Sequence, residues 1–118
     1  MTTEEQFRER TKQFALEVLR AAGDVPSSLA ADVLVKQLIR SATSVGANYR
    51  AACHARSKPD FIAKLSIAQE ECDESVYWIE LLGALELLGD GDALRLRDEG
   101  RAITAMLTSS IKTARSRP

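Results

Sequence analysis

Residues 61–82 read FIAKLSIAQEECDESVYWIELL, and this stretch decides the fold. Its apolar and small side chains recur at alternating intervals of four and three residues, which is the spacing of one helix face and not the alternation of a β-strand. The residues that keep this spacing are Phe61, Leu65, Ala68, Cys72, Ser75, Ile79 and Leu82. Such a stripe predicts a long helix that packs against neighbouring helices at a shallow angle.

Helical spacing continues on both sides of this stretch and is interrupted three times by turn-forming residues. The interruptions are GDVPSS at 23–28, SKPD at 57–60 and GDGD at 89–92. They predict helices over about residues 3–22, 28–55, 58–88 and 91–114. Because short links between long helices favour antiparallel neighbours, we expect an all-α fold, an up-down-up-down four-helix bundle that forms a single domain over residues 1–118.

Length, charge and hydropathy exclude several classes of protein. The 118 residues include 16 Lys and Arg against 17 Asp and Glu, and a dedicated polyanion-binding protein would usually be basic overall. No apolar run approaches the roughly 20 residues that cross a bilayer, and the first residues are too polar for a secretory signal. Two cysteines cannot form a disulfide framework. We therefore expect a cytoplasmic protein without a membrane partner.

The charges are unevenly divided along the chain. The second predicted helix is mostly basic and contains Arg40 and Arg50, whereas the third is mostly acidic and contains Glu71 and Glu74. From Arg101 to the end there are four basic residues and no acidic one. One interpretation is that these are solvated helix faces. The other is that acidic and basic faces pair, either between helices or between subunits, because complementary charge sets register and partner choice.

Motifs for catalysis or metal binding are missing from this sequence. A ferritin-like di-metal site needs two Glu-x-x-His pairs, but the single histidine, His54, has no Glu three residues before it. Cys53, His54 and Cys72 offer at most three of the four ligands that zinc needs. There is also no nucleophile triad and no glycine loop for phosphate after a strand. We expect no enzyme activity, no metal and no cofactor, and a small-molecule or metal-binding enzyme is the least favoured function.

Two groups of residues are candidates for contacts. Aromatic residues and arginines commonly anchor protein surfaces, and Asn48 lies in a cluster of small residues where a polar side chain can fix register. The candidates for interhelix or subunit contacts are Arg40, Asn48, Arg50, Glu71, Glu74, Tyr77 and Trp78. The candidates for nucleic-acid contact are Lys112, Arg115 and Arg117 near the C-terminus.

Part of the sequence resembles a known family. The pattern Gln37-Leu38-x-Arg40-Ser41-Ala42-x-Ser44-Val45-x-x-Asn48, followed by Phe61, Leu65, Ile67, Ala68, Glu71 and Glu74, is similar to the bacterial four helix bundle proteins, also called ribosomal-RNA intervening-sequence proteins. The similarity spans about residues 7–111 and is densest over residues 37–82. After Asn48 the common Ile-Ala-Glu-Gly run is replaced by Tyr49-Arg50-Ala51-Ala52, which with Tyr77-Trp78 resembles an Asn-Tyr-Arg-Ala and Tyr-Trp sub-branch.

The resemblance implies an up-down bundle that assembles into a cyclic homo-oligomer, a ring-like pentamer, without enzyme activity. Some relatives are encoded within ribosomal-RNA insertions, and others assist retroelements by engaging reverse transcriptase and nucleic acid through a basic barrel. Two functions are therefore expected in order of preference. The first is a non-enzymatic homo-oligomeric module for protein–protein interaction or assembly, and the alternative is a nucleic-acid-binding accessory protein.

Overall fold

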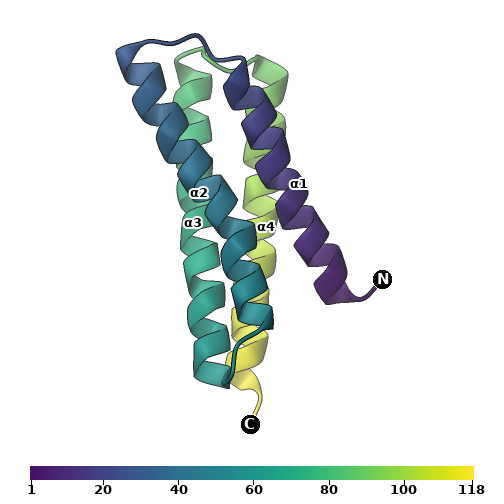
Figure 1. Ribbon diagram of the computed structural model, residues 1–118. Coiled ribbons are helices and arrows are strands. Elements are labelled where there is room, and N and C mark those ends of the chain that lie inside the picture. Colours follow the sequence, from purple (N-terminus) through teal and green to yellow (C-terminus); the bar gives the residue numbers. More distant parts are fainter.

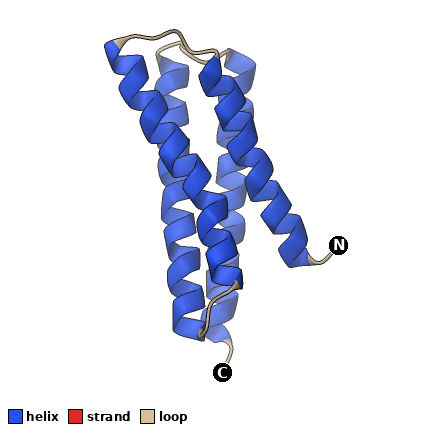
Figure 2. Ribbon diagram, in the orientation of Figure 1, coloured by secondary structure: helices blue, strands red, loops and turns tan.

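The computed structural model confirms an all-α fold of four helices packed side by side (Figure 1). It describes the backbone of residues 1–118 and the side chains of residues 1–89 and 91–118. The helices are α1 (Thr3–Gly23), α2 (Leu29–Cys53), α3 (Lys58–Ala84) and α4 (Asp90–Ser116). Each runs antiparallel to the next, and only short loops join them (Figure 2). The bundle measures 50 × 25 × 19 Å.

Side-chain caps define where three of the helices begin. The side chains of Thr2, Ser28 and Ser57 accept hydrogen bonds from backbone N–H groups in the first turns of α1, α2 and α3. These bonds satisfy donors that have no partner inside a helix. Proline also lies in the first turn of α3, where its missing N–H costs little.

Helix α3 ends at Ala84, about one turn before the residue 88 expected from sequence, and that part of the expectation was wrong. The chain leaves the helix through a left-handed residue, Glu86, with φ of 59°. Glu86 N–H donates to the carbonyl of Gly83 at 3.0 Å, and Leu87 N–H donates to the carbonyl of Leu82 at 2.9 Å. This is the Schellman arrangement of a helix C-terminus. Leu88 nevertheless returns to the core, so its apolar character does not distinguish loop from helix.

The core lies along the centre of the bundle, where all four helices contribute fully buried side chains. The largest of these are Phe14, Leu38, Leu65, Ile79, Leu82, Leu96, Ile103 and Leu107. Two glycines allow close helix approach: a Cβ on Gly46 would lie 3.2 Å from Thr11 Oγ1, and a Cβ on Gly100 would lie 2.7 Å from Val76 Cγ2. The predicted stripe of α3 is therefore the centre of the packing.

The shortest helix, α1, covers only part of the bundle. Its C-terminal half lies against its neighbours at the upper end of Figure 1, and its N-terminal half leans away from α4 (Figure 1). Arg10 holds the two helices together where they are still close, because its Nε and Nη2 atoms donate to the Glu99 carboxylate at 2.9 and 2.7 Å. The lower halves of α2, α3 and α4 consequently form a more open end.

Candidate functional site

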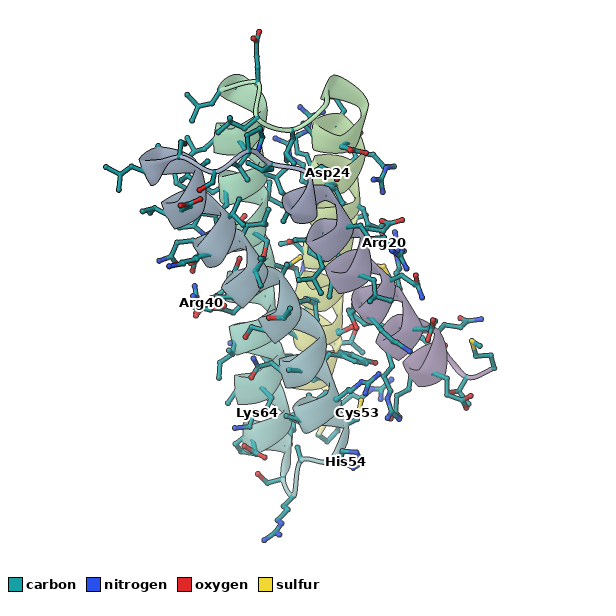
Figure 3. All side chains as sticks on the ribbon, turned by 45° about the horizontal axis from the view of Figure 1, so that its top comes forward. Arg20, Asp24, Arg40, Cys53, His54 and Lys64 are labelled. Atoms are coloured by element: carbon teal, nitrogen blue, oxygen red, sulfur yellow. The ribbon has the colours of Figure 1, made fainter. Side chains whose placement is uncertain are left out.

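An arginine bridges two glutamates on the outer side of α2 and α3. Arg40 Nη1 lies 2.8 Å from Glu71 Oε2, and Arg40 Nη2 lies 2.5 Å from Glu74 Oε1. The negative charge of Glu71 is the main reason why the pKa of Arg40 is raised above its ordinary value. Figure 3 shows Arg40 on the outside of α2, well away from Cys53 and His54 at the lower end of the same helix. The structure thus brings three of the candidate contact residues together.

Two aromatic residues extend this cluster along α3. Trp78 is half-buried, and its Nε1–H donates to Glu74 Oε1 at 3.3 Å. Tyr77 is 53% exposed, and the centroids of the Tyr77 and Trp78 rings are 5.2 Å apart. Glu74 therefore accepts hydrogen bonds from both Arg40 and Trp78, which fixes the aromatic pair beside the ion pair.

Exposed aliphatic side chains continue the same side toward the upper end of the bundle. Leu29 is 88% exposed and Val33 is 54% exposed, one turn apart at the start of α2, and Leu85 just after α3 is 55% exposed. Together with the polar cluster, they form a surface that we call the α2–α3 face, composed of Leu29, Val33, Arg40, Glu71, Glu74, Tyr77, Trp78 and Leu85. Large aliphatic residues gathered at one place on a surface are typical of interaction sites.

Two other candidates, Asn48 and Arg50, lie further along α2. Asn48 Nδ2 donates to the carbonyl and the hydroxyl of Ser44 at 2.9 and 2.8 Å, so the amide is satisfied within its own helix. Arg50 is exposed in the last turn of α2. Among the described side chains, neither residue takes part in the Arg40 cluster.

The three candidates for nucleic-acid contact lie at the open lower end. Lys112, Arg115 and Arg117 are exposed in or just after the last turns of α4. Arg56 in the α2–α3 loop and Lys58 at the start of α3 are also exposed there, and Lys58 Nζ donates to the backbone carbonyl of Arg117. We call these five residues the basic end. Sequence reasoning missed the contribution of Arg56 and Lys58, although the expected antiparallel packing places that loop beside the end of α4.

A groove beside the basic end contains a thiol and a phenol. It has a volume of about 750 Å³ and is lined in part by Glu4, Tyr49, Cys53, Phe61 and Ala114. Burial raises the pKa of Cys53 to about 11 and the pKa of Tyr49 to about 12. Both groups are therefore protonated at neutral pH, and this thiol lacks the depressed pKa of a reactive cysteine.

The described residues contain neither a cluster of metal ligands nor a helix that could span a membrane. Within them, no group of three or more His, Cys, Asp or Glu side chains is placed to hold a metal ion. His54 is exposed and caps the end of α2. No helix among these residues combines the length and apolarity that crossing a bilayer would require.

Comparison with known proteins supports the architecture. Residues 4–109 match the model of the 23S rRNA-intervening sequence protein family. A solved structure, from Bacteroides thetaiotaomicron VPI-5482, is described as a protein with unknown function from the S23 ribosomal protein family. It is 32% identical to this chain and superposes with a TM-score of 0.86, covering 94% of this chain and 99% of its own. None of the curated proteins matches this chain.

Proposed function

The chain belongs to the 23S rRNA-intervening sequence protein family, and from this premise we propose that it is a non-enzymatic homo-oligomeric module whose α2–α3 face binds other copies of the chain. The observation that carries the proposal is the composition of that face. Leu29, Val33 and Leu85 leave aliphatic surface in water around a polar cluster that is already paired and ordered. Burying such aliphatic area contributes roughly 25 cal/mol per Å².

The dimensions of the bundle suit this role. A side of the bundle measuring 50 by 19 Å is larger than the roughly 800 Å² per partner that a standard protein interface buries. Tyr77, Trp78 and Arg40 are of the residue types that carry most binding energy in such interfaces. The resemblance to ring-forming relatives favours a cyclic pentamer.

The absence of activated groups favours a non-enzymatic role. In the groove beside the basic end, burial raises the pKa of the Cys53 thiol to about 11 and the pKa of the Tyr49 phenol to about 12. The glutamates of the α2–α3 face are occupied by Arg40, which leaves them poor candidates for general bases.

Light scattering on the full chain tests the proposal. We expect a mass that is a multiple of the 12.9 kDa monomer at micromolar concentration. The single tryptophan, Trp78, lies on the proposed interface and is half-buried in the monomer. Its emission should therefore shift to longer wavelength when the protein is diluted and dissociates. A monomeric mass at every concentration, with unchanged emission, contradicts assembly.

The basic end supports a second candidate function, nucleic-acid binding. Five exposed basic residues from two separate segments lie together there, although the whole chain has a net charge of −1. In a ring whose copies point the same way, these ends would gather on one rim, and several weak patches bind strongly together. Binding to such a patch should weaken steeply as salt rises.

Fluorescence anisotropy with a labelled mixed-sequence RNA tests this second function. The variant Lys112→Glu/Arg115→Glu should lose binding at low salt. The matched control, Lys12→Glu/Arg20→Glu, changes the net charge equally on exposed residues of α1 and should retain most of the binding. Equal losses in the two variants, or no binding by the unmodified chain at low salt, would remove nucleic acid as a partner.

A further inference from the structure

An apolar groove runs between α3 and α4 near the upper end of the bundle. It has a volume of about 410 Å³, and its lining includes Ile79, Gly83, Ala84, Ala93 and Leu94. It is hollow because small residues face each other there: a Cβ on Gly83 would lie only 3.0 Å from Ala93 Cβ. Leu94 at its edge is 52% exposed. Nothing in the described part of the chain fills this groove.

A matching apolar projection lies at the same end of the molecule. Leu29 is the first residue of α2 and Val33 follows one turn later, with exposures of 88% and 54%. The start of α2 stands away from the other helices at the upper end of Figure 1. Two aliphatic side chains on a projecting helix end form a knob of the kind that inserts into a groove.

The knob and the groove lie at the same height but on neighbouring sides of the bundle. The knob belongs to the α2–α3 face, and the groove lies between α3 and α4. They are therefore separate surfaces of one chain, which can meet only when two copies lie side by side. A contact between two different surfaces of identical copies is heterologous, and it generates a ring when the rotation closes.

Charges on the two surfaces complement each other. Asp32 lies three residues after Leu29, and Lys36 lies three residues after Val33. Both charged side chains are exposed beside the knob. Glu80 and Arg97 line the groove. Within its own chain Glu80 pairs with Arg101 at 3.1 Å and Arg97 pairs with Asp98 at 3.0 Å, so the charges of a seated knob would join these ion pairs. Such complementarity orients a contact and disfavours other registers.

We propose that the α2 knob of one copy, Leu29 and Val33, inserts into the α3–α4 groove of the next copy. This inference rests on the proposed function, because it names the surface onto which the α2–α3 face docks. It makes every contact in the assembly head-to-tail around the ring, with all copies pointing the same way. The basic ends then lie on one rim.

Two complementary variants test the proposal in the full chain. The knob variant is Leu29→Glu/Val33→Lys, and the groove variant is Ala84→Arg/Leu94→Glu. All four positions are exposed, and the new charges suit their places near helix ends, so both variants should fold. Neither pair changes the net charge. Leu19→Lys, at an exposed leucine on α1, is the control.

Light scattering should show that each variant alone is a 12.9 kDa monomer, whereas the control keeps the mass of the unmodified chain. An equimolar mixture at high concentration should contain a complex of two copies and no larger species. The unchanged knob of the groove variant can bind the unchanged groove of the knob variant, whereas the substituted knob and the substituted groove cannot bind further copies. Variants that assemble as the unmodified chain does, or a mixture that stays monomeric, overturn the knob-in-groove contact while leaving assembly standing. A monomeric unmodified chain overturns assembly itself.

Disulfide trapping provides a second measurement that does not depend on weakening the contact. In a Cys53→Ser background, Val33→Cys/Ala84→Cys should form a covalent ladder of copies on mild oxidation. The matched variant Leu19→Cys/Ala84→Cys should not. A ladder in the matched variant, or none in the first, contradicts the proposed contact.

Discussion

Ser75 Oγ lies 2.8 Å from Ser41 Oγ, and both serines are fully buried between α2 and α3. The Ser41 hydroxyl donates to the carbonyl of Leu38 in the same helix at 3.2 Å. Its oxygen can therefore accept a hydrogen bond from the Ser75 hydroxyl. Each serine directly follows a member of the ion-pair cluster that spans the same two helices: Ser41 follows Arg40, and Ser75 follows Glu74. The α2–α3 contact is thus joined by a buried neutral bond and an exposed ionic one.

Removing either buried serine hydroxyl should destabilise the bundle. We expect Ser75→Ala to lower the free energy of unfolding by about 1 kcal/mol, because it deletes a buried hydrogen bond. The double variant Ser41→Ala/Ser75→Ala should cost less than the sum of the single changes, since both changes remove the same bond. Urea unfolding at one fixed protein concentration measures the three values. Ser109→Ala, at an exposed position, is the control, and strictly additive losses would show that the serines do not interact.

A glycine at position 86 should stabilise the protein. Glu86 has φ of 59°, a left-handed conformation that costs a residue with a Cβ about 1 kcal/mol and costs glycine little. Glu86→Gly should therefore raise the free energy of unfolding by about 1 kcal/mol, as measured by urea or thermal unfolding. Ala63→Gly, at an exposed position within α3, should lower it by a similar amount. A loss of stability in Glu86→Gly would mean that the Glu86 side chain contributes more than its backbone costs.

The helical arrangement was predictable because it depends on spacing, and spacing is visible in a sequence. The α3 stripe and the three interruptions each indicated the bundle. The end of α3 was not predictable, because Leu88 is buried by a returning loop and has the same apolar character as a residue in the helix. Local composition carries no signal that separates these two routes to burial.

The candidate site was predictable only in its charged part. Opposite charges concentrated on successive helices pointed to Arg40 with Glu71 and Glu74, which the structure places together. The knob and groove were missed for a different reason. Leu29 is 88% exposed and Leu38 is fully buried, although both are leucines in the same amphipathic helix. Exposure of this kind is set by where neighbouring helices end, which is a property of the packed bundle.

An alanine at position 100 should destabilise the bundle although alanine favours helices. A Cβ on Gly100 would lie 2.7 Å from Val76 Cγ2, so α3 and α4 would have to move apart. Overpacking of this kind costs about 1–3 kcal/mol, against a gain of about 1 kcal/mol from helix propensity. Thermal unfolding should show a net loss in Gly100→Ala and recovery when Val76→Ala is added. In Gly91→Ala, where nothing lies within 4 Å of the new Cβ, only the propensity gain should remain.

The buried thiol of Cys72 should make stability fall at high pH. Burial raises the pKa of Cys72 from 9.0 to about 11, and Sγ donates to the Gly100 carbonyl at 3.2 Å. Because the pKa is higher in the folded state than in the unfolded state, the folded protein retains the proton that the unfolded chain releases. The stabilisation from this group is complete below pH 9 and is lost as the pH rises from about 9 to about 11, by roughly 2 kcal/mol. Urea unfolding across that range should show a smaller decline in Cys72→Ala than in the unmodified chain. Parallel curves for the two proteins would mean that this thiol titrates with the same pKa in both states.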